Sequence, residues 1–273
     1  MEYNNKMSIV VLSCDAYSDL WDDFFNLKEK YWPNCNFQCY LVNNNKHYNR
    51  DGVVVINAGQ GNWSSRFRIA VEQIESEYIC TFLEDYFITD TINNNLINEL
   101  LDFSENNKVS FLNLGDVFGH IINLKNLEYF SPNQIIIPKH LKYGVDTAGA
   151  IWDKQYLLRK LGKGDYSAWQ FEKDRCIEAL SNEGIDGLIL CDDRKPLNIC
   201  EIPVVIQGKF YPPAIRFFKK KGYSINHSQR KIMTIKDVFM YKFKNSFAKI
   251  KFCRKTIKKL ASVFMGYKFV TED

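Results

Sequence analysis

The sequence predicts an α/β fold with a Rossmann-like, mostly parallel central sheet flanked by helices and followed by a basic helical extension. Short β-branched runs alternate with amphipathic helical segments early in the chain, the order expected of a parallel sheet with right-handed crossovers. The 273 residues, 46% of them hydrophobic, suffice for one large core and a small appendage. We expect a main domain over residues 1–215, with halves near 1–115 and 116–215, and an extension over residues 216–273.

The predicted strands are short apolar runs bounded by polar residues. Residues 8–13 are an uninterrupted β-branched run, and residues 79–83 form a similar run that is too short for a buried helix. The pattern between Phe118 and Lys142 is irregular, so we expect loops and short antiparallel strands there. Further strands are expected at residues 37–42, 53–56, 109–112, 187–191 and 199–206.

The predicted helices follow these strands. One runs from Leu20 to Tyr31 and stops at Pro33, and another follows the Gly-rich residues 59–61 with Ser64 as its N-cap. Later helices are expected through residues 96–101 and 176–180. From Ile232 to Phe264 apolar residues recur about every 3.6 positions, the period of an amphipathic helix.

Cysteine, histidine and hydropathy patterns narrow the class of protein. The eight cysteines form no CxxC pair and several lie in apolar runs, so we expect reduced thiols. The four histidines are far apart and show no zinc-binding spacing. No charged-then-apolar leader opens the sequence and no run of 18 apolar residues occurs. We therefore expect a cytoplasmic protein.

The charge is divided unevenly along the chain. Residues 1–206 carry 19 Lys and Arg against 29 Asp and Glu, whereas residues 207–270 carry 17 against the single acid Asp237. A basic helix with one apolar stripe suits an anionic membrane surface, so residues 232–268 predict peripheral contact with the inner face of the plasma membrane. Packing of the stripe on the main domain or on a second subunit stays open. Nucleic acid is not expected as a partner, because the aromatic residues of this helix lie on its apolar stripe and are not spaced as exposed rings on which bases could stack.

Polar residues follow three of the predicted strands. Ser13 and Asp15 follow the first strand, Asn43 ends the second, and Glu84 and Asp85 follow the strand at residues 79–83. Ligands collect at the carboxyl ends of strands in open α/β sheets, where adjacent acids are costly unless a cation or donor groups offset them. These positions predict a functional site at one sheet edge. The alternatives are a water-facing acidic pair and, for Asp15 and Asn43, helix-start and turn residues.

Four ordered segments carry a resemblance to a known family. Residues 13–21 read Ser-Cys-Asp-Ala-Tyr-Ser-Asp-Leu-Trp, residues 63–66 Trp-Ser-Ser-Arg and residues 84–87 Glu-Asp-Tyr-Phe. The fourth segment, residues 149–152, reads Gly-Ala-Ile-Trp and is followed by Trp-Gln-Phe-Glu at residues 169–172. Over about residues 8–215 the chain resembles bacterial GT-A-fold glycosyltransferases of capsule and O-antigen assembly. Each motif is weakly specific by itself, so their order and spacing carry the resemblance.

The resemblance implies roles for individual residues. It implies that Asp85 and Glu84 hold Mn²⁺ or Mg²⁺ at the leaving diphosphate, although Tyr86 stands where the Asp-x-Asp pattern has its second acid. A metal-independent enzyme stays open. It implies that Glu172 is the general base, although Lys173 replaces a following acid. Because indole rings stack on sugar faces, Trp152 and Trp169 are expected to contact the acceptor, with core or hinge packing as the alternative. The nucleotide-sugar contacts that the resemblance implies are Ser13, Asp15, Tyr17, Asn43, Trp63, Arg66, Glu84, Asp85 and Lys209.

The resemblance implies that the protein transfers a hexose from a nucleotide diphosphate sugar to a hydroxyl of a glycan, with inversion at the anomeric carbon. The expected acceptor is a lipid-linked glycan of surface polysaccharide synthesis. Two alternatives from other classes stay open. A nucleotidyltransferase acting on sugar phosphates would use the same sheet, yet no Gly-rich phosphate loop and no GxGxxG follows the first strand. A non-catalytic membrane-surface assembly protein would keep the basic helix and would need neither Asp85 nor Glu172.

Overall fold

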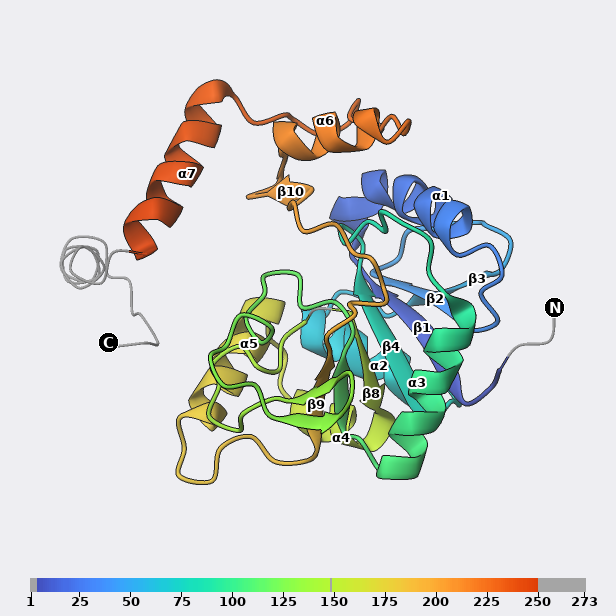
Figure 1. The fold of residues 1–273 in the computed structure, drawn as a ribbon. Coiled ribbons are helices and arrows are strands. Elements are labelled where there is room, and N and C mark those ends of the chain that lie inside the picture. The colour runs from blue at the N-terminus through green and yellow to red at the C-terminus, as the bar shows by residue number, and fades with distance from the viewer. Residues whose placement is uncertain (1–3, 148, 250–273) are drawn as a thin grey trace. The chain divides into compact units, whose positions relative to one another are not determined.

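The protein contains one large mixed sheet with helices on both faces. The structure is a computed structural model that describes residues 4–147 and 149–249. The chain divides after Val204 into two compact units (Figure 1). The first unit holds a nine-stranded sheet in the order β3-β2-β1-β4-β8-β5-β9-β7-β6. The domain boundary that the sequence predicts near residue 215 stays a prediction.

The direction of the strands confirms the predicted α/β class with a mostly parallel sheet. β1 pairs in parallel with β2 and β4, β2 with β3, and β5 with β9, whereas β7 and β8 run against their neighbours. The strands are β1 (Met7–Leu12), β2 (Gln38–Asn43), β3 (Val53–Asn57), β4 (Tyr78–Leu83), β5 (Phe111–Asn113), β6 (Tyr129–Ser131), β7 (Gln134–Ile136), β8 (Ala150–Asp153) and β9 (Ile189–Asp192).

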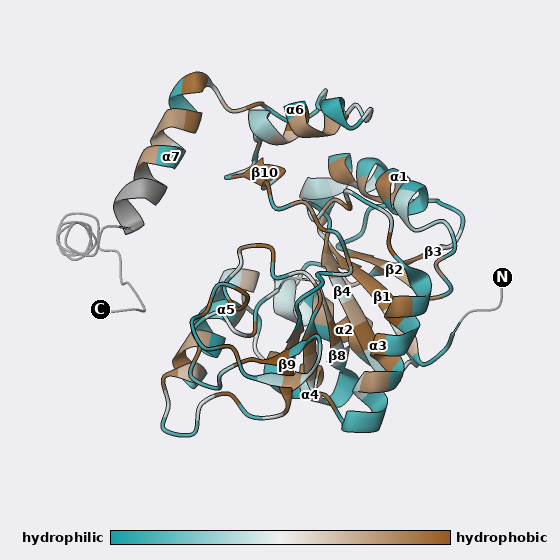
Figure 2. Ribbon diagram, viewed as in Figure 1, coloured by the Kyte–Doolittle hydropathy of each residue, from teal (hydrophilic) through white to brown (hydrophobic). Residues whose placement is uncertain are grey.

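β1 and β4 lie in the interior of the sheet because they are apolar on both faces. Every residue of β1 is buried, and β4 is buried from Tyr78 to Phe82. Figure 2 shows the hydrophobic colour running along these central strands. Helices must therefore cover both faces, which is typical of parallel strands.

Two helices cover one face. Phe24 of α1 (Trp21–Tyr31) packs edge-to-face on Phe82 of β4, with ring centroids 5.7 Å apart. The Trp32 indole donates to Asn94 at the start of α3 (Asn94–Asn107), which places α3 beside the end of α1. A 3-10 helix, η1 (Asp15–Leu20), leads from β1 into α1.

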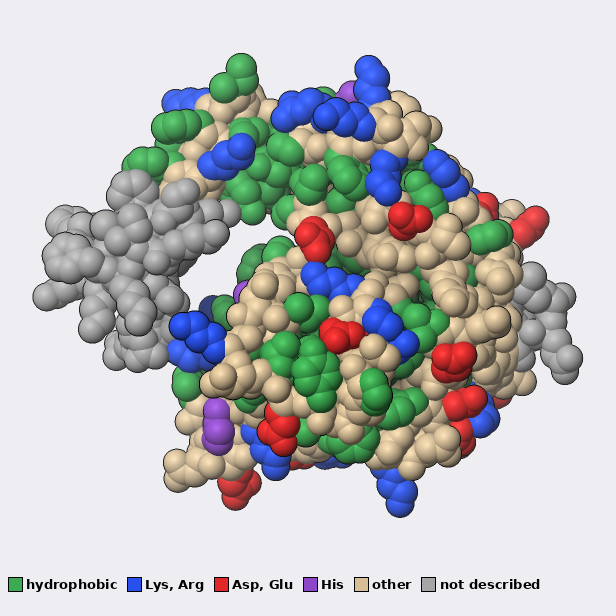
Figure 3. All heavy atoms as spheres, in the orientation of Figure 1, with side chains coloured by type: hydrophobic (Ala, Val, Ile, Leu, Met, Phe, Trp, Pro, Cys, Tyr) green, Lys and Arg blue, Asp and Glu red, His purple; other side chains and the backbone are tan. Residues whose placement is uncertain are grey.

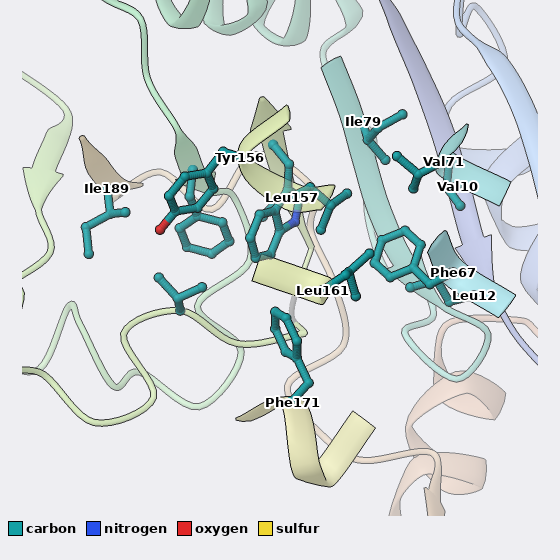
Figure 4. Close-up of a cluster of buried hydrophobic side chains, with 14 of the residues drawn as sticks. Val10, Leu12, Phe67, Val71, Ile79, Tyr156, Leu157, Leu161, Phe171 and Ile189 are labelled. Atoms are coloured by element: carbon teal, nitrogen blue, oxygen red, sulfur yellow. The ribbon is translucent and has the colours of Figure 1, made fainter. Parts of the chain in front are cut away.

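Three helices cover the other face and enclose the main core. They are α2 (Trp63–Gln73), α4 (Lys154–Leu161) and α5 (Ala168–Ala179). Figure 4 shows Leu157, Leu161 and Phe171 pointing toward one another, beside Phe67 and Val71 of α2. Phe171 is only 1% exposed, so it fixes the first turns of α5 against the sheet.

Two local expectations were wrong, and two elements were not predicted. Asn62, not Ser64, is the N-cap of α2, and the buried Ser64 hydroxyl donates instead to the Gly164 carbonyl, 2.9 Å away. The strand expected at residues 199–206 shrinks to an isolated bridge at Ile199 and the two residues of β10 (Val205–Ile206). β8 and α4 were not predicted, because β8 has only four residues and no alternation of polar and apolar positions.

The second unit is small and basic. A hairpin of β10 and β11 (Lys209–Phe210) precedes α6 (Pro212–Lys220) and α7 (Ile235–Lys249). Figure 3 shows Lys and Arg side chains over α6, where Arg216, Lys219 and Lys220 are exposed. The predicted stripe beyond Lys249 lies outside the described residues. Within the described ranges, no helix is long and apolar enough to cross a membrane.

Candidate active site

The candidate site lies at the edge where the parallel strands of the first unit end. β1, β2, β4 and β5 all end at this edge, and the antiparallel β8 begins there. The edge therefore gathers the residues that follow β1 and β4, the ends of β2 and β5, and the residues that precede β8. These include Ser13, Asp15, Asn43, Glu84, Asp85, Asn113 and Thr147.

The loops after β1 and β2 are joined through Asp15. Its carboxylate accepts the backbone N–H groups of Asn44, Asn45 and Lys46, at 3.1 to 3.2 Å. The Ser13 hydroxyl accepts the indole N–H of the buried Trp21 at 2.7 Å. Both side chains thus hold the protein's own loops in place, and their contacts to a nucleotide stay predictions. Tyr17 is half-buried in η1, beside these loops.

Arg66 converges on the ends of β1 and β4. Its guanidinium donates to the backbone carbonyls of Gly61 and Ser13. Burial and the Glu84 carboxylate raise the pKa of the Cys14 thiol, whereas the Arg66 guanidinium lowers it. The Cys14 thiol therefore lies near both charges. The motifs at residues 13–21, 63–66 and 84–87 thus meet at this point.

Several buried polar atoms at this edge have no hydrogen-bond partner among the described residues. They are Asn43 Oδ1 at the end of β2, Asn113 Nδ2 at the end of β5, and Trp63 Nε1 and Arg66 Nε in the first turn of α2. An unsatisfied buried polar group costs about 1–3 kcal/mol. Donors and acceptors left open along one sheet edge are what a polar ligand such as a nucleotide requires.

The loop before α5 is fixed to the start of α2. Asp165 accepts the Asn62 backbone N–H at 2.7 Å and the Ser65 hydroxyl at 2.6 Å, and these contacts hold the pKa of its carboxyl below the usual range. The Tyr166 N–H donates to the Ser64 hydroxyl at 2.8 Å. Helix α5, which carries Glu172, is therefore fixed relative to helix α2, which carries Arg66.

Glu172 lies in a small polar network at the beginning of β8. The Thr147 hydroxyl donates to Glu172 Oε1 at 2.9 Å. Burial raises the pKa of Glu172, and the Thr147 hydroxyl, the Thr147 backbone and the charge of His120 reduce this shift. A carboxylate with a raised pKa and a hydrogen bond that fixes its orientation is suited to accept a proton.

Tyr86 connects this network to the acidic end of β4. Burial raises its pKa well above the ordinary value, the carboxylates of Asp85, Asp146 and Glu172 add to this effect, and a hydrogen bond with Thr147 opposes it. The phenol therefore lies near all three acids. The sequence reasoning treated Tyr86 only as a departure from the motif and missed this contact.

The remaining predicted residues do not join this network. Trp152 was wrongly predicted to stack on an acceptor sugar, because it is 2% exposed in the core and its indole donates to Thr81 at 3.2 Å. Trp169 is 76% exposed on α5, so its acceptor role stays a prediction. Lys209 belongs to the second unit, where it forms a 2.9 Å ion pair with Asp237. Its phosphate contact also stays a prediction.

The acids at this edge offer oxygen ligands but no closed metal site. In the part of the chain that the structure describes, no three His, Cys, Asp or Glu side chains gather as a metal-binding group. Adjacent Glu84 and Asp85 are hard oxygen donors of the kind that Mg²⁺ and Mn²⁺ prefer. These two residues could hold a metal only if other ligands, such as phosphate oxygens, completed the coordination.

Comparisons with known proteins give distant likenesses. No protein-family model and no curated protein matches the sequence. Similar solved structures include Campylobacter jejuni IspDF, at 13% identity over 62% of this chain and 47% of that chain, with a TM-score of 0.36. S. aureus TarS is 13% identical over 68% and 36% of the two chains, with a TM-score of 0.41. This chain spans less than half the length of either protein.

A mutant of Drosophila β-1,4-galactosyltransferase 7, solved with manganese, UDP-Gal and xylobiose, is 12% identical over 72% of this chain and 70% of that chain, with a TM-score of 0.40. Likenesses as low as these carry no argument about activity. The function must be argued from the site itself.

Proposed function

We propose that this chain is a glycosyltransferase that moves a hexose from a nucleotide diphosphate sugar to a glycan hydroxyl, with inversion. One observation carries the proposal. The half-buried Glu172 carboxylate, oriented by Thr147, shares a network through Tyr86 with the acidic strand end at Asp85. A proton acceptor therefore lies next to the sheet edge where a polar ligand would bind, which is the arrangement that transfer of a glycosyl group to a hydroxyl requires.

The donor would lie along the ends of β1, β2 and β4. Arg66 supplies a cation in the first turn of α2, where the positive end of the helix dipole also favours phosphate. The orphaned atoms of Asn43 and Trp63 offer an acceptor and a donor of hydrogen bonds. Ser13, Asp15 and Tyr17 complete the nucleotide-facing loop. Lys209 is a further proposed phosphate contact.

Glu172 would act as the general base. The acceptor oxygen forms a bond to the anomeric carbon as the bond from that carbon to the diphosphate oxygen breaks, and the hydroxyl proton moves to a Glu172 carboxylate oxygen. The nucleoside diphosphate leaves with the bonding electrons. If Asp85 and Glu84 hold Mn²⁺ or Mg²⁺, that ion neutralises the leaving diphosphate. In a metal-independent enzyme, basic side chains such as Arg66 would neutralise it.

The acceptor that we propose is a lipid-linked glycan of surface polysaccharide synthesis, such as capsule or O-antigen, at the inner membrane face. The second unit supports a membrane contact through its exposed apolar residues. Ile235 is 92% exposed and Phe239 is 64% exposed, on a helix that also carries Lys236 and Lys242. An apolar stripe flanked by cations suits an anionic bilayer surface.

The test is a panel of nucleotide sugars with the purified protein. We expect one nucleotide to raise the melting temperature and its sugar conjugate to be hydrolysed or transferred. Glu172→Gln should abolish transfer while nucleotide binding persists, because the amide cannot accept the proton. Turnover that is unchanged in Glu172→Gln would refute the base assignment.

Adding nucleoside triphosphates and sugar phosphates to the panel separates the alternative functions. A nucleotidyltransferase would release pyrophosphate from a nucleoside triphosphate and a sugar phosphate, so pyrophosphate release without glycosyl transfer would favour that class. Failure of every nucleotide to bind would favour a non-catalytic assembly protein.

A further inference from the structure

Three aromatic rings form a surface cluster near Glu172. Phe118 and His120 lie in the loop after β5, and Tyr143 lies in the segment before β8. The rings of His120 and Tyr143 stack, with centroids 5.7 Å apart and planes 21° apart. Phe118 lies at a tilt to His120, with centroids 5.8 Å apart. We call these three residues the aromatic cluster.

The aromatic cluster is exposed although its backbone is held firmly. Phe118 is 58% exposed and Tyr143 is 40% exposed, and His120 is exposed as well. The buried Asn113 side chain accepts the N–H groups of Gly115 and Asp116, at 3.0 and 2.7 Å. Asp116 in turn accepts two backbone N–H groups at 3.3 and 3.0 Å, from Ile121 and Ile122. The loop therefore presents its rings in a fixed position, which lowers the entropy cost of binding.

The chain path and two interactions place the aromatic cluster on the side of the proposed base. Tyr143 precedes Thr147 by four residues, and the Thr147 hydroxyl donates to Glu172 Oε1 at 2.9 Å. The charge of His120 acts on the Glu172 carboxyl. The backbone of Tyr143 hydrogen-bonds the Cys176 thiol, which is four residues beyond Glu172 and on the same face of α5. Both ring-bearing segments thus border the carboxylate from the side of β5 and β8.

The sheet order separates this cluster from the proposed donor contacts. The strands run β2-β1-β4-β8-β5, so the loops of β1 and β2 lie on one side of the acidic end of β4 and the loop of β5 lies on the other. A donor held by Arg66 and Asn43 would occupy the first side. A hydroxyl that attacks from the opposite direction would approach past the aromatic cluster and Glu172.

We propose that Phe118, His120 and Tyr143 form the binding surface for the acceptor sugar, a pyranose whose C–H face stacks on the rings. This inference rests on the proposed glycosyl transfer. Aromatic rings offer broad apolar area at low entropy cost, and the imidazole adds a polar group that can meet a ring hydroxyl.

The test uses saturation-transfer NMR with a panel of methyl pyranosides, in the presence of the nucleotide that the protein binds. We compare wild type with Phe118→Ala and with Tyr143→Asn, which suits the positive φ of 59° at that position. Phe130→Ala is the matched control, because Phe130 is 42% exposed on β6 and contacts Phe103. All three side chains are exposed, so the variants should fold.

We expect at least one pyranoside to receive saturation at its ring C–H protons from wild type and from Phe130→Ala. Loss of one ring should weaken binding about 3- to 10-fold, from the usual worth of an aromatic contact. The proposal is overturned if no pyranoside binds wild type, or if both cluster variants bind like wild type. Nucleotide binding is measured separately by thermal shift, so failure of the donor proposal is distinguishable from failure of this one.

Discussion

Thr147→Val is expected to move the acid limb of the pH–rate profile to higher pH. The Thr147 hydroxyl donates to Glu172 Oε1 at 2.9 Å and is one of the contacts that hold down the pKa of that carboxyl. Valine has nearly the same shape but no donor. The ionised form of Glu172 therefore loses stabilisation, and a base must be ionised to act.

The size of the effect follows from the geometry. A hydrogen bond to a charged group is worth about 1.5–3 kcal/mol, and one pKa unit corresponds to about 1.4 kcal/mol. The Thr147 backbone also hydrogen-bonds Glu172 and stays in the variant. We therefore expect the lower end of the range, a displacement of the acid limb by about one pH unit. At pH values well above the acid limb, kcat/KM should change little, because Glu172 is ionised there in both proteins.

The assay is kcat/KM against pH with the nucleotide sugar that responds in the panel. In wild type the limb should lie above 4.5, the ordinary pKa of a glutamic acid, because burial raises the pKa of Glu172. Thr147→Ser is the matched control, because it keeps the hydroxyl and should keep the wild-type limb. The assignment fails if Thr147→Val and Thr147→Ser give the same profile.

Two further predictions concern the donor and the membrane. Arg66→Gln should weaken binding of the nucleoside diphosphate about 10- to 100-fold, as expected from loss of a charge-assisted hydrogen bond. Arg68→Gln on the same helix is the control and should leave binding unchanged. Equal effects of the two substitutions in a calorimetric titration would count against the phosphate role of Arg66. Ile235→Ser combined with Phe239→Ser should weaken sedimentation with phosphatidylserine-containing vesicles by at least about 10-fold, because each buried apolar side chain is worth about 1.5–3 kcal/mol. Equal sedimentation of variant and wild type would exclude the stripe as the contact.

The central part of the fold was predictable because its sequence signals are local and strong. β1 and β4 are mostly apolar and β-branched or aromatic, with Ser8 and Thr81 as their polar residues, and such short runs are typical of strands buried on both faces of a sheet. β8 gave no such signal, since four residues between a glycine-containing loop and a helix have no measurable period. The strand expected at residues 199–206 failed because Pro203 interrupts the apolar run, which leaves one bridge at Ile199 and the two residues of β10.

The site was predictable only where sheet topology alone determines proximity. Asn43 ends β2 and Glu84 and Asp85 follow β4, and these parallel strands flank β1, so their placement at one sheet edge follows from the order of the strands. Asn113 carries the same signal at the end of β5 and could have been found in this way. His120 and Tyr143 could not, because they are brought together by loops whose path depends on tertiary contacts.

Tyr86 shows how a departure from a motif can have a physical role. The resemblance implies a second acid at this position, so the proposed metal site would have one ligand fewer at the end of β4. In the structure the phenol instead hydrogen-bonds with Thr147 and lies near Asp85 and Glu172. A neutral side chain there avoids adding a further negative charge beside the proposed base, whose carboxylate must stay ionised to act. We infer that the lost metal ligand places more of the diphosphate charge on Arg66, so Arg66→Gln should be most harmful in the absence of divalent metal.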